Sequence, residues 1–279
     1  MDWLTAALQL RRDGLPGVLV TVLEVRGHAP RDPGTKMVVA AGGSWGSVGG
    51  GNLEESAIHR ARSMIAGSAA GSELLESKLT ARSRNAHGRQ CCGGTVRLLL
   101  EPLPVWPTVA IFGVGHVGLE LARILARLQI RLQLVDSRAE QLDRVRLAEV
   151  IDGVAEVSVH HAVLGEQVLE RLPPGAHVLI MTHDHAEDLA LCDMALRLPA
   201  LSSIGLIGSS AKWAMFRTRL AELGHAAESI DRIDCPIGLP GVAGKEPAVI
   251  AIAVAAALVP ALVRQLPPAQ TEALPVSEL

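Results

Sequence analysis

Aromatic residues are scarce in this chain of 279 residues. Tyrosine is absent, and tryptophan and phenylalanine together make up 2% of the sequence, so few residues are available to stack on nucleic-acid bases. Positive charge is not in excess either, because 26 basic residues stand against 29 acidic ones and the formal net charge is −3. Both features argue against nucleic acid, or an anionic membrane surface, as the main partner.

Cysteine and long apolar runs are also few. Four cysteines in a chain of this size do not make a disulfide framework. The longest apolar run, Ala248 to Val263, has 16 residues and contains Pro260, whereas a membrane span needs about 20; we therefore expect a buried helix. The first residues, MDWLTAALQLRRDG, lack the pattern of a secretory signal. Together these features predict a soluble, cytoplasmic protein.

Proline marks a boundary near the middle of the chain. Residues 101–107, EPLPVWP, contain three prolines and predict a linker. Residues 1–100 mix strands and helices without a repeating unit, which predicts an N-terminal mixed α/β domain. Residues 108–265 alternate strands with helices, which predicts a doubly wound, Rossmann-like α/β domain with a parallel sheet. Residues 266–279 are expected to form a flexible tail.

A glycine motif opens the second domain. Gly113, Gly115 and Gly118 follow G-x-G-x-x-G between a predicted strand and a predicted helix, and Asp136 ends the next strand. The glycines suit a tight turn, close approach of the backbone to a phosphate, and close helix–strand packing. This pattern predicts a Rossmann unit. Bound NAD is a separate hypothesis, because the glycines can serve the turn and the packing alone while Asp136 caps the next helix.

Two more loops follow strands at the same edge of the predicted sheet. The loop THDHAED contains His183, His185 and Asp188, which suit a divalent metal or proton transfer, or simply a polar loop facing a ligand. The later loop contains Ser209 and Lys212. They suit an anion at a helix N-terminus, or alternatively a plain cap with the lysine in solvent. Three loops at one edge predict a ligand crevice.

The first domain has three polar, turn-rich loops. In chain order they carry Arg31 and Lys36, then Gly49, Gly50 and Gly51, and then Cys91, Cys92 and Gly93. Free N–H groups of the triple glycine, together with the two cations, suit an anion. A hairpin followed by a capped helix, with Asn52 as N-cap and Glu55 three residues later, is the alternative.

The paired cysteines are the more specific signal. Adjacent Cα atoms are about 3.8 Å apart, shorter than the span of about 4.4 Å or more that disulfides adopt, so both are expected to be thiols. Nearby Arg89 favours the thiolate of Cys91 or Cys92. A nucleophile, a persulfide carrier and a soft ligand for a thiophilic metal are the roles open to them. Cys192 and Cys235 are expected to pack in apolar surroundings.

The ordered set of motifs is characteristic of one family. The motifs are GHAPRDPGTKMVV, GSVGGGNLE, QCCGG, FGVGHVG, THDHAEDL, IGLIGSSAKW and CPIGLPGVAGKEPAVIA. From about Gly17 to Leu258 the chain resembles the XdhC family of xanthine dehydrogenase accessory proteins, the XdhC/CoxI group. No single motif carries the resemblance, since G-x-G-x-x-G is shared with many dehydrogenases, but the ordered set is specific.

The resemblance implies a molybdenum-cofactor chaperone rather than an enzyme. Such proteins bind molybdopterin cofactor between their domains, hold it while a cysteine desulfurase exchanges a molybdenum oxo ligand for sulfido, and deliver it to the molybdenum-binding subunit of apo xanthine dehydrogenase. The implied cofactor contacts are Arg31, Lys36, Gly49, Gly50, Gly51, Cys91, Cys92, Gly93, Gly113, Gly115, Gly118, His183, Asp188, Ser209 and Lys212, with Cys92 the candidate molybdenum contact. The apolar C-terminal helix makes a homodimer the expected assembly.

Two other functions stay open on the residues alone. An NAD(P)-dependent oxidoreductase would use Asp136 for the ribose hydroxyls, with the following Ser137-Arg138 leaving NADP possible. A zinc hydrolase would use His183, His185 and Asp188.

Overall fold

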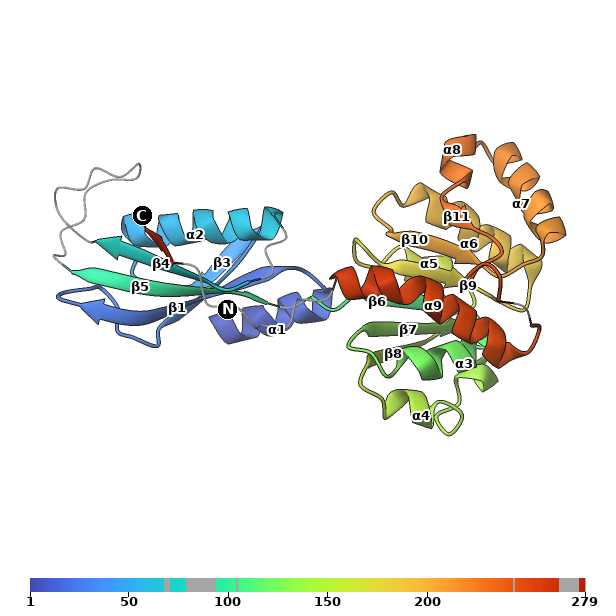
Figure 1. The fold of residues 1–279 in the computed structure, drawn as a ribbon, viewed down its shortest axis with the longest axis horizontal. Coiled ribbons are helices and arrows are strands. Elements are labelled where there is room, and N and C mark those ends of the chain that lie inside the picture. The colour runs from blue at the N-terminus through green and yellow to red at the C-terminus, as the bar shows by residue number, and fades with distance from the viewer. Residues whose placement is uncertain (68–70, 79–93, 104, 243, 266–275, 279) are drawn as a thin grey trace. The chain divides into compact units, whose positions relative to one another are not determined.

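The chain forms two compact units in the computed structural model. One consists of Met1–Val105 with Leu266–Leu279, and the other of Trp106–Gln265 (Figure 1). The structure describes residues 1–67, 71–78, 94–103, 105–242, 244–265 and 276–278.

The first unit contains a six-stranded sheet with strand order β12-β4-β5-β1-β2-β3. Its strands are β1 (Gly17–Arg26), β2 (Lys36–Ala40), β3 (Gly43–Gly46), β4 (Glu73–Lys78), β5 (Thr95–Leu103) and β12 (Val276–Glu278). Neighbouring strands are antiparallel except β12 and β4, which are parallel. β12 lies in the segment for which the sequence predicts a tail.

One helix covers each face of this sheet (Figure 1). Alternate residues of β1 point to opposite faces. Val18, Val20 and Val22 join the core beneath α2 (Gly51–Ala66), while Leu19 packs in the smaller core beneath α1 (Trp3–Asp13). The apolar alternation of β1 therefore supplies both cores of the mixed α/β unit.

The second unit is a parallel sheet with strand order β11-β10-β9-β6-β7-β8. Its strands are β6 (Thr108–Phe112), β7 (Arg131–Asp136), β8 (Glu156–His161), β9 (His177–Ile180), β10 (Ser203–Leu206) and β11 (Ile233–Asp234). Numbered from β6 along the chain, this is the order 3-2-1-4-5-6 of the Rossmann fold. The prediction of a mixed α/β domain followed by a doubly wound domain is confirmed.

Helices cover both faces of the parallel sheet because the side chains of its strands alternate. Val109 and Ile111 of β6 join the core on one face, and Ala110 and Phe112 join the core on the other. α3 (His116–Leu125), α4 (Ala148–Ile151) and α9 (Pro247–Gln265) supply the first core, while α5 (Glu166–Leu169), α6 (His185–Arg197), α7 (Ser210–Glu222) and α8 (Ala227–Ile230) supply the second. A short 3-10 helix, η1 (Ala139–Leu142), follows β7.

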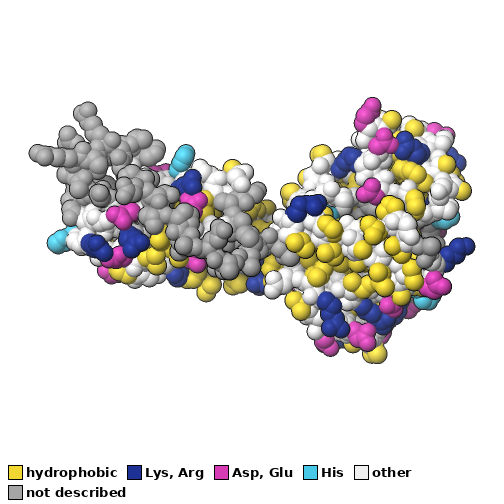
Figure 2. Space-filling view, in the orientation of Figure 1, with side chains coloured by type: hydrophobic (Ala, Val, Ile, Leu, Met, Phe, Trp, Pro, Cys, Tyr) yellow, Lys and Arg dark blue, Asp and Glu magenta, His cyan; other side chains and the backbone are white. Residues whose placement is uncertain are grey.

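α9 is buried on one face only, although the sequence predicted a buried helix. Ala251, Val254 and Leu258 pack into the core against α3. On the opposite side Ile252 and Val263 are each 58% exposed, and hydrophobic side chains gather on this face of the unit (Figure 2). Within the described residues, α9 alone has the length and composition that would allow a helix to cross a membrane.

A buried histidine joins the end of α9 to the sheet. His177 is 1% exposed; its Nδ1 lies 2.7 Å from Ser203 Oγ and its Nε2 lies 3.1 Å from Gln265 Nε2. Burial lowers the pKa of this imidazole. The folded chain therefore holds His177 neutral, with Nδ1 as the donor and Nε2 as the acceptor.

We expect this histidine to make the second unit less stable in mild acid. Below the ordinary His pKa of 6.5 the unfolded chain binds a proton that folded His177 does not, so stability falls as the pH drops from there toward the lowered folded pKa. Urea unfolding at pH 7 and pH 5 should show a smaller loss for His177→Gln than for the unmodified chain. Exposed His116→Gln is the control, and equal losses in all three proteins would contradict the assignment.

Candidate functional site

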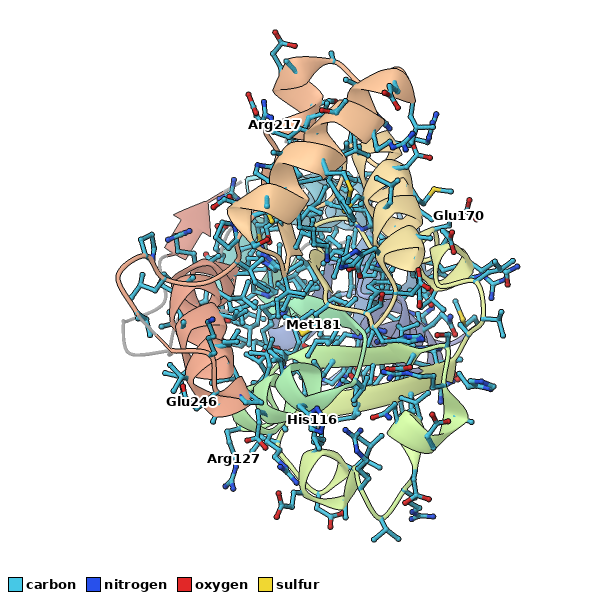
Figure 3. The ribbon with its side chains drawn as sticks, turned by 90° about the vertical axis from the view of Figure 1, so that its right-hand side faces the viewer. His116, Arg127, Glu170, Met181, Arg217 and Glu246 are labelled. Atoms are coloured by element: carbon cyan, nitrogen blue, oxygen red, sulfur yellow. The ribbon has the colours of Figure 1, made fainter. Side chains whose placement is uncertain are left out.

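Loops of the second unit meet at the carboxyl edge of its sheet, where the strand order reverses between β6 and β9. Gly113 follows β6, and Met181 follows β9 and donates its N–H to Phe112 O at 2.8 Å. Figure 3 looks onto this edge, with Met181 near the centre and His116 at the start of α3. Ligands of open α/β sheets bind at such a reversal, so the predicted crevice lies where this fold places ligands.

The three motif glycines differ in what surrounds them. A Cβ on Gly113, whose φ is +98°, would lie 2.3 Å from Met181 O, and a Cβ on Gly118 would lie 2.1 Å from Gly113 O. A Cβ on Gly115 would have only Arg138 Nη2 near it, at 4.0 Å. The first and third glycines therefore serve the turn and the packing, while the second leaves the backbone open to a ligand.

Asp136 is fully engaged within the protein. Its Oδ2 accepts from Val114 N at 2.7 Å and Arg138 Nη2 at 3.1 Å, and its Oδ1 accepts from the backbone N and the Nε of Arg138, each at 3.0 Å. Burial raises the pKa of Asp136, but these bonds from Arg138 and Val114 outweigh it and hold the pKa below its usual value. The carboxylate thus ties the glycine loop to Arg138 and caps no helix.

A hollow of about 470 Å³ lies beside Gly115. It is lined by Gly115, His116, Leu119, Glu120, Arg123, Arg138, Gln141, Arg146 and Pro247. Arg146 links two segments that line the hollow, because its Nη1 donates to Val114 O at 2.8 Å and to Gln141 O at 2.6 Å. Neither Arg123 nor Arg146 was identified as a site residue from the sequence, since both are brought here by the packing of α3 and of the segment after η1.

Asp188 and Lys212 form a buried ion pair between α6 and α7. Asp188 is 0% exposed and accepts from Lys212 Nζ at 2.5 Å, from Thr182 Oγ1 at 2.7 Å and from Thr182 N at 3.0 Å. Lys212 also donates to Ile207 O at 2.9 Å, and its side chain is 10% exposed. The alternative of a solvent-facing Lys212 is therefore wrong.

The other residues of these two loops do not join that pair. His183 Nδ1 lies 3.9 Å from Glu187 Oε2, whereas the ring of His185 packs edge-on against Phe216. Ser209 caps α7 by accepting from Lys212 N. Across the residues that the structure describes, no group of three His, Cys, Asp or Glu side chains could hold a metal. The metal cluster of His183, His185 and Asp188, which was one of the alternatives for this loop, is therefore wrong.

Glu187 is a crevice residue that sequence analysis did not identify. Its Oε2 accepts from Ser137 Oγ at 3.2 Å, which joins the end of β7 to the first turn of α6. Burial raises its pKa, a shift that Ser137 and His183 partly oppose. Its position in the first helical turn after β9, at the ligand-binding edge of the sheet, is the sequence feature that could have identified it.

In the first unit, the glycine loop is held by Glu54. Its Oε2 accepts from Ser47 Oγ at 2.5 Å and from the N–H groups of Val48 and Gly50, each at 3.1 Å. Within the triple glycine, Glu54 therefore occupies the N–H of Gly50, and Ser47 Oγ accepts from the N–H of Gly49 at 3.3 Å, so two of the N–H groups expected to be free for an anion are occupied. The predicted cap by Asn52 is also wrong, because Gly50 is the N-cap of α2 and makes no side-chain cap bond.

Asn52 instead lies buried in the first turn of α2. It is 5% exposed, and its Oδ1 has no hydrogen-bond partner among the described residues. The orphaned oxygen is an acceptor, so it suits a ligand that carries an N–H or O–H donor.

The loop of His28 and Pro30 in the first unit lies against both Gly49 and Gly94. A Cβ on Gly49 would lie 2.5 Å from Pro30 Cγ, and a Cβ on Gly94 would lie 2.5 Å from His28 O. The loop that carries exposed Arg31 therefore contacts both the glycine loop and the residue two places after Cys92. Lys36 is directed elsewhere, with Nζ 3.0 Å from Thr21 Oγ1 and 6.0 Å from the ring centre of Trp3 in α1.

The cysteines divide into two groups. Cys91, Cys92 and Gly93 lie outside the described residues. Cys192 and Cys235 pack against the second unit's core, as predicted, and burial raises the pKa of both thiols. Neither of these two is a nucleophile near neutral pH.

Comparisons with known proteins cover both units. Residues 109–258 match the family described as the XdhC Rossmann domain, and residues 10–78 match the XdhC and CoxI family. The uncharacterized protein YqeB of Escherichia coli K12 is 27% identical over 258 residues, which are 92% of this chain but 45% of that protein. The chain thus spans less than half the length of this relative.

Two solved structures also align with the chain. A xanthine dehydrogenase from Bacillus halodurans has 18% identity and a TM-score of 0.48, covering 97% of this chain and 98% of that one. The dehydrogenase part of multifunctional enzyme 1 from C. elegans has 14% identity and a TM-score of 0.33, covering 62% and 41%. Because one family model spans more than half of the residues and a second spans much of the first unit, the chain belongs to the XdhC family.

Proposed function

We propose that the chain is an accessory protein of xanthine dehydrogenase maturation that binds molybdenum cofactor and delivers it to the apo enzyme. Membership in the XdhC family supports the accessory role. The observation that supports cofactor binding is that the loop of His28 and Pro30 contacts both Gly94 and Gly49. Cys92 precedes Gly94 by two residues.

The residues present fit the chemistry of this cofactor. The molybdenum is bound by dithiolene sulfur and is thiophilic, so Cys92 is the residue that would hold it. The pterin carries N–H donors, which suit the orphaned Oδ1 of Asn52. Its phosphate suits exposed Arg31 better than the glycine loop, because Glu54 already occupies N–H groups of that loop.

The chain's own residues would bind and shield the cofactor rather than turn over a substrate. A cysteine desulfurase as sulfur donor, the molybdenum-binding subunit of xanthine dehydrogenase as acceptor, a homodimer and a cytoplasmic location belong to the same proposal. The contrasting reading, an NAD-dependent oxidoreductase, loses its ribose acceptor because every lone pair of Asp136 is engaged.

Replacing Cys92 by alanine should slow delivery of the cofactor to the apo enzyme. Loss of the thiol removes the proposed molybdenum contact, so we expect the rate of activation of apo xanthine dehydrogenase to fall about tenfold or more. Molybdenum retained after gel filtration with the cofactor should fall in parallel. Cys235→Ala, which changes a half-buried thiol of the second unit, is the matched control. Normal binding and delivery by both Cys92→Ala and Cys91→Ala would refute the thiol role.

A further inference from the structure

The hollow beside Gly115 offers hydrogen-bond donors but lacks the acceptor that a ribose needs. A carboxylate has about four lone-pair sites, and Asp136 uses them on Val114 N and on three N–H groups of Arg138. In Rossmann domains that bind NAD, the carboxylate at this position accepts from ribose hydroxyls. Here the 3% exposed Asp136 has no capacity left for them.

The guanidinium of Arg138 covers the carboxylate oxygens that Asp136 would otherwise offer to a ligand. Its Nε and Nη2 are bound to the carboxylate in a bidentate pair, which leaves Nη1 and one Nη2 hydrogen for a ligand. Arg138 Nη2 is also 4.0 Å from where a Gly115 Cβ would be. A guanidinium held rigidly in this way is suited to bidentate binding of phosphate.

Arg146 adds a second cation at the hollow. Glu120 and Glu149 pair with Arg123, and Asp136 pairs with Arg138. The guanidinium of Arg146 donates to carbonyl oxygens, namely Val114 O, Gln141 O and Gly115 O, and among the described residues no carboxylate forms an ion pair with it. Its charge is therefore left for an anion that enters the hollow.

The dimensions of the hollow agree with a nucleotide. Its volume of about 470 Å³ falls within the range of roughly 300–1,000 Å³ typical of small-molecule sites. His116 at the start of α3 and Pro247 at the start of α9 border it.

We propose that the second unit binds a nucleotide whose ribose carries a phosphate monoester, as in NADP(H), and discriminates against the same nucleotide with a free ribose, as in NAD(H). Arg138 and Arg146 recognise the phosphate, and the saturation of Asp136 by Arg138 removes the partner of the free hydroxyls. The residues of this site all belong to the second unit, so the proposal stands whether or not the first unit carries molybdenum cofactor.

Isothermal titration calorimetry of the full chain with NADPH and NADH tests the proposal. We expect NADPH to bind about tenfold tighter or more, since charge-assisted bonds to phosphate have no counterpart in NADH. Arg138→Leu should lower NADPH affinity about tenfold and raise NADH affinity, because it frees the oxygens of Asp136. Arg144→Leu changes an exposed arginine outside the hollow and should leave both affinities unchanged.

Two further arms keep the result decisive. Arg138→Lys retains the charge without the bidentate fork, so it should retain part of the preference for NADPH even if Arg138→Leu folds poorly. Adenosine 2′-monophosphate should displace NADPH better than adenosine 5′-monophosphate does. Equal affinities for NADPH and NADH, no binding of either, or displacement by inorganic phosphate as effective as by adenosine 2′-monophosphate would overturn the proposal.

Discussion

Replacing Lys212 by methionine is expected to lower the free energy of unfolding by about 3–5 kcal/mol. The substitution leaves Asp188 as a carboxylate with 0% exposure and without its cation. The two bonds from Thr182 remain, but they do not replace the lost charge. Removing one partner of a buried pair costs far more than the net contribution of the pair, because the uncompensated charge stays buried.

Urea unfolding at neutral pH checks this value. Lys212→Met combined with Asp188→Asn should recover more than half of the loss, since the amide is neutral and its oxygen still accepts from Thr182. Lys245→Met removes an exposed lysine and should change stability by no more than about 0.5 kcal/mol. A loss for Lys212→Met as small as that of the control would show that the pair is not buried in solution.

The fold was predictable from local pattern, and the roles of its glycines followed. Alternation of apolar strands with helical segments is enough to specify a doubly wound sheet. The need for glycine at position 118 arises from the backbone of Gly113, five residues earlier, and the need at position 113 arises from the backbone of Met181 and Thr182, directly after β9. These constraints come from the backbone path of a strand–turn–helix unit. The G-x-G-x-x-G spacing is therefore enough to predict them.

The partners of the charged side chains were not predictable in the same way. Asp188 was proposed as a metal ligand and Asp136 as a ribose acceptor, yet Lys212 and Arg138 occupy them. Which cation reaches which carboxylate depends on rotamers and on the packing of helices, neither of which a single sequence specifies. The alternation pattern places such residues at an edge, but it does not pair them.

The prediction that Asn52 caps α2 was wrong for a related reason. Asn52 and Glu55 have the spacing of a capping box, but Glu54 makes the bonds to the loop. Positive φ values at Gly49, Gly50 and Gly51 bend the loop back toward the helix. Its N–H groups are therefore reached by Glu54, the residue before Glu55. Three consecutive glycines permit backbone paths that a spacing rule does not consider.

Replacing Gly113 by alanine should destabilise the second unit by about 3 kcal/mol or more. The new Cβ would meet Met181 O at 2.3 Å and Thr182 Cα at 2.7 Å, and both are backbone atoms that no rotamer change can move. The φ of +98° adds the strain of the left-handed region for any residue with a Cβ. Relief requires β6 to move away from the end of β9, which disrupts the centre of the sheet.

Two matched alanine substitutions separate these contributions. Gly224 has a φ of +93° but nothing within 4 Å of its Cβ position, so Gly224→Ala reports the backbone strain alone, about 1–2 kcal/mol. Gly115→Ala meets only Arg138 Nη2 at 4.0 Å and has φ −69°, so it should leave stability within about 1 kcal/mol. Thermal and urea unfolding of the three variants measure the order. If Gly113→Ala were no worse than Gly224→Ala, the close contact between the β6 and β9 loops would not exist in solution, and the crevice would lack its rigid floor.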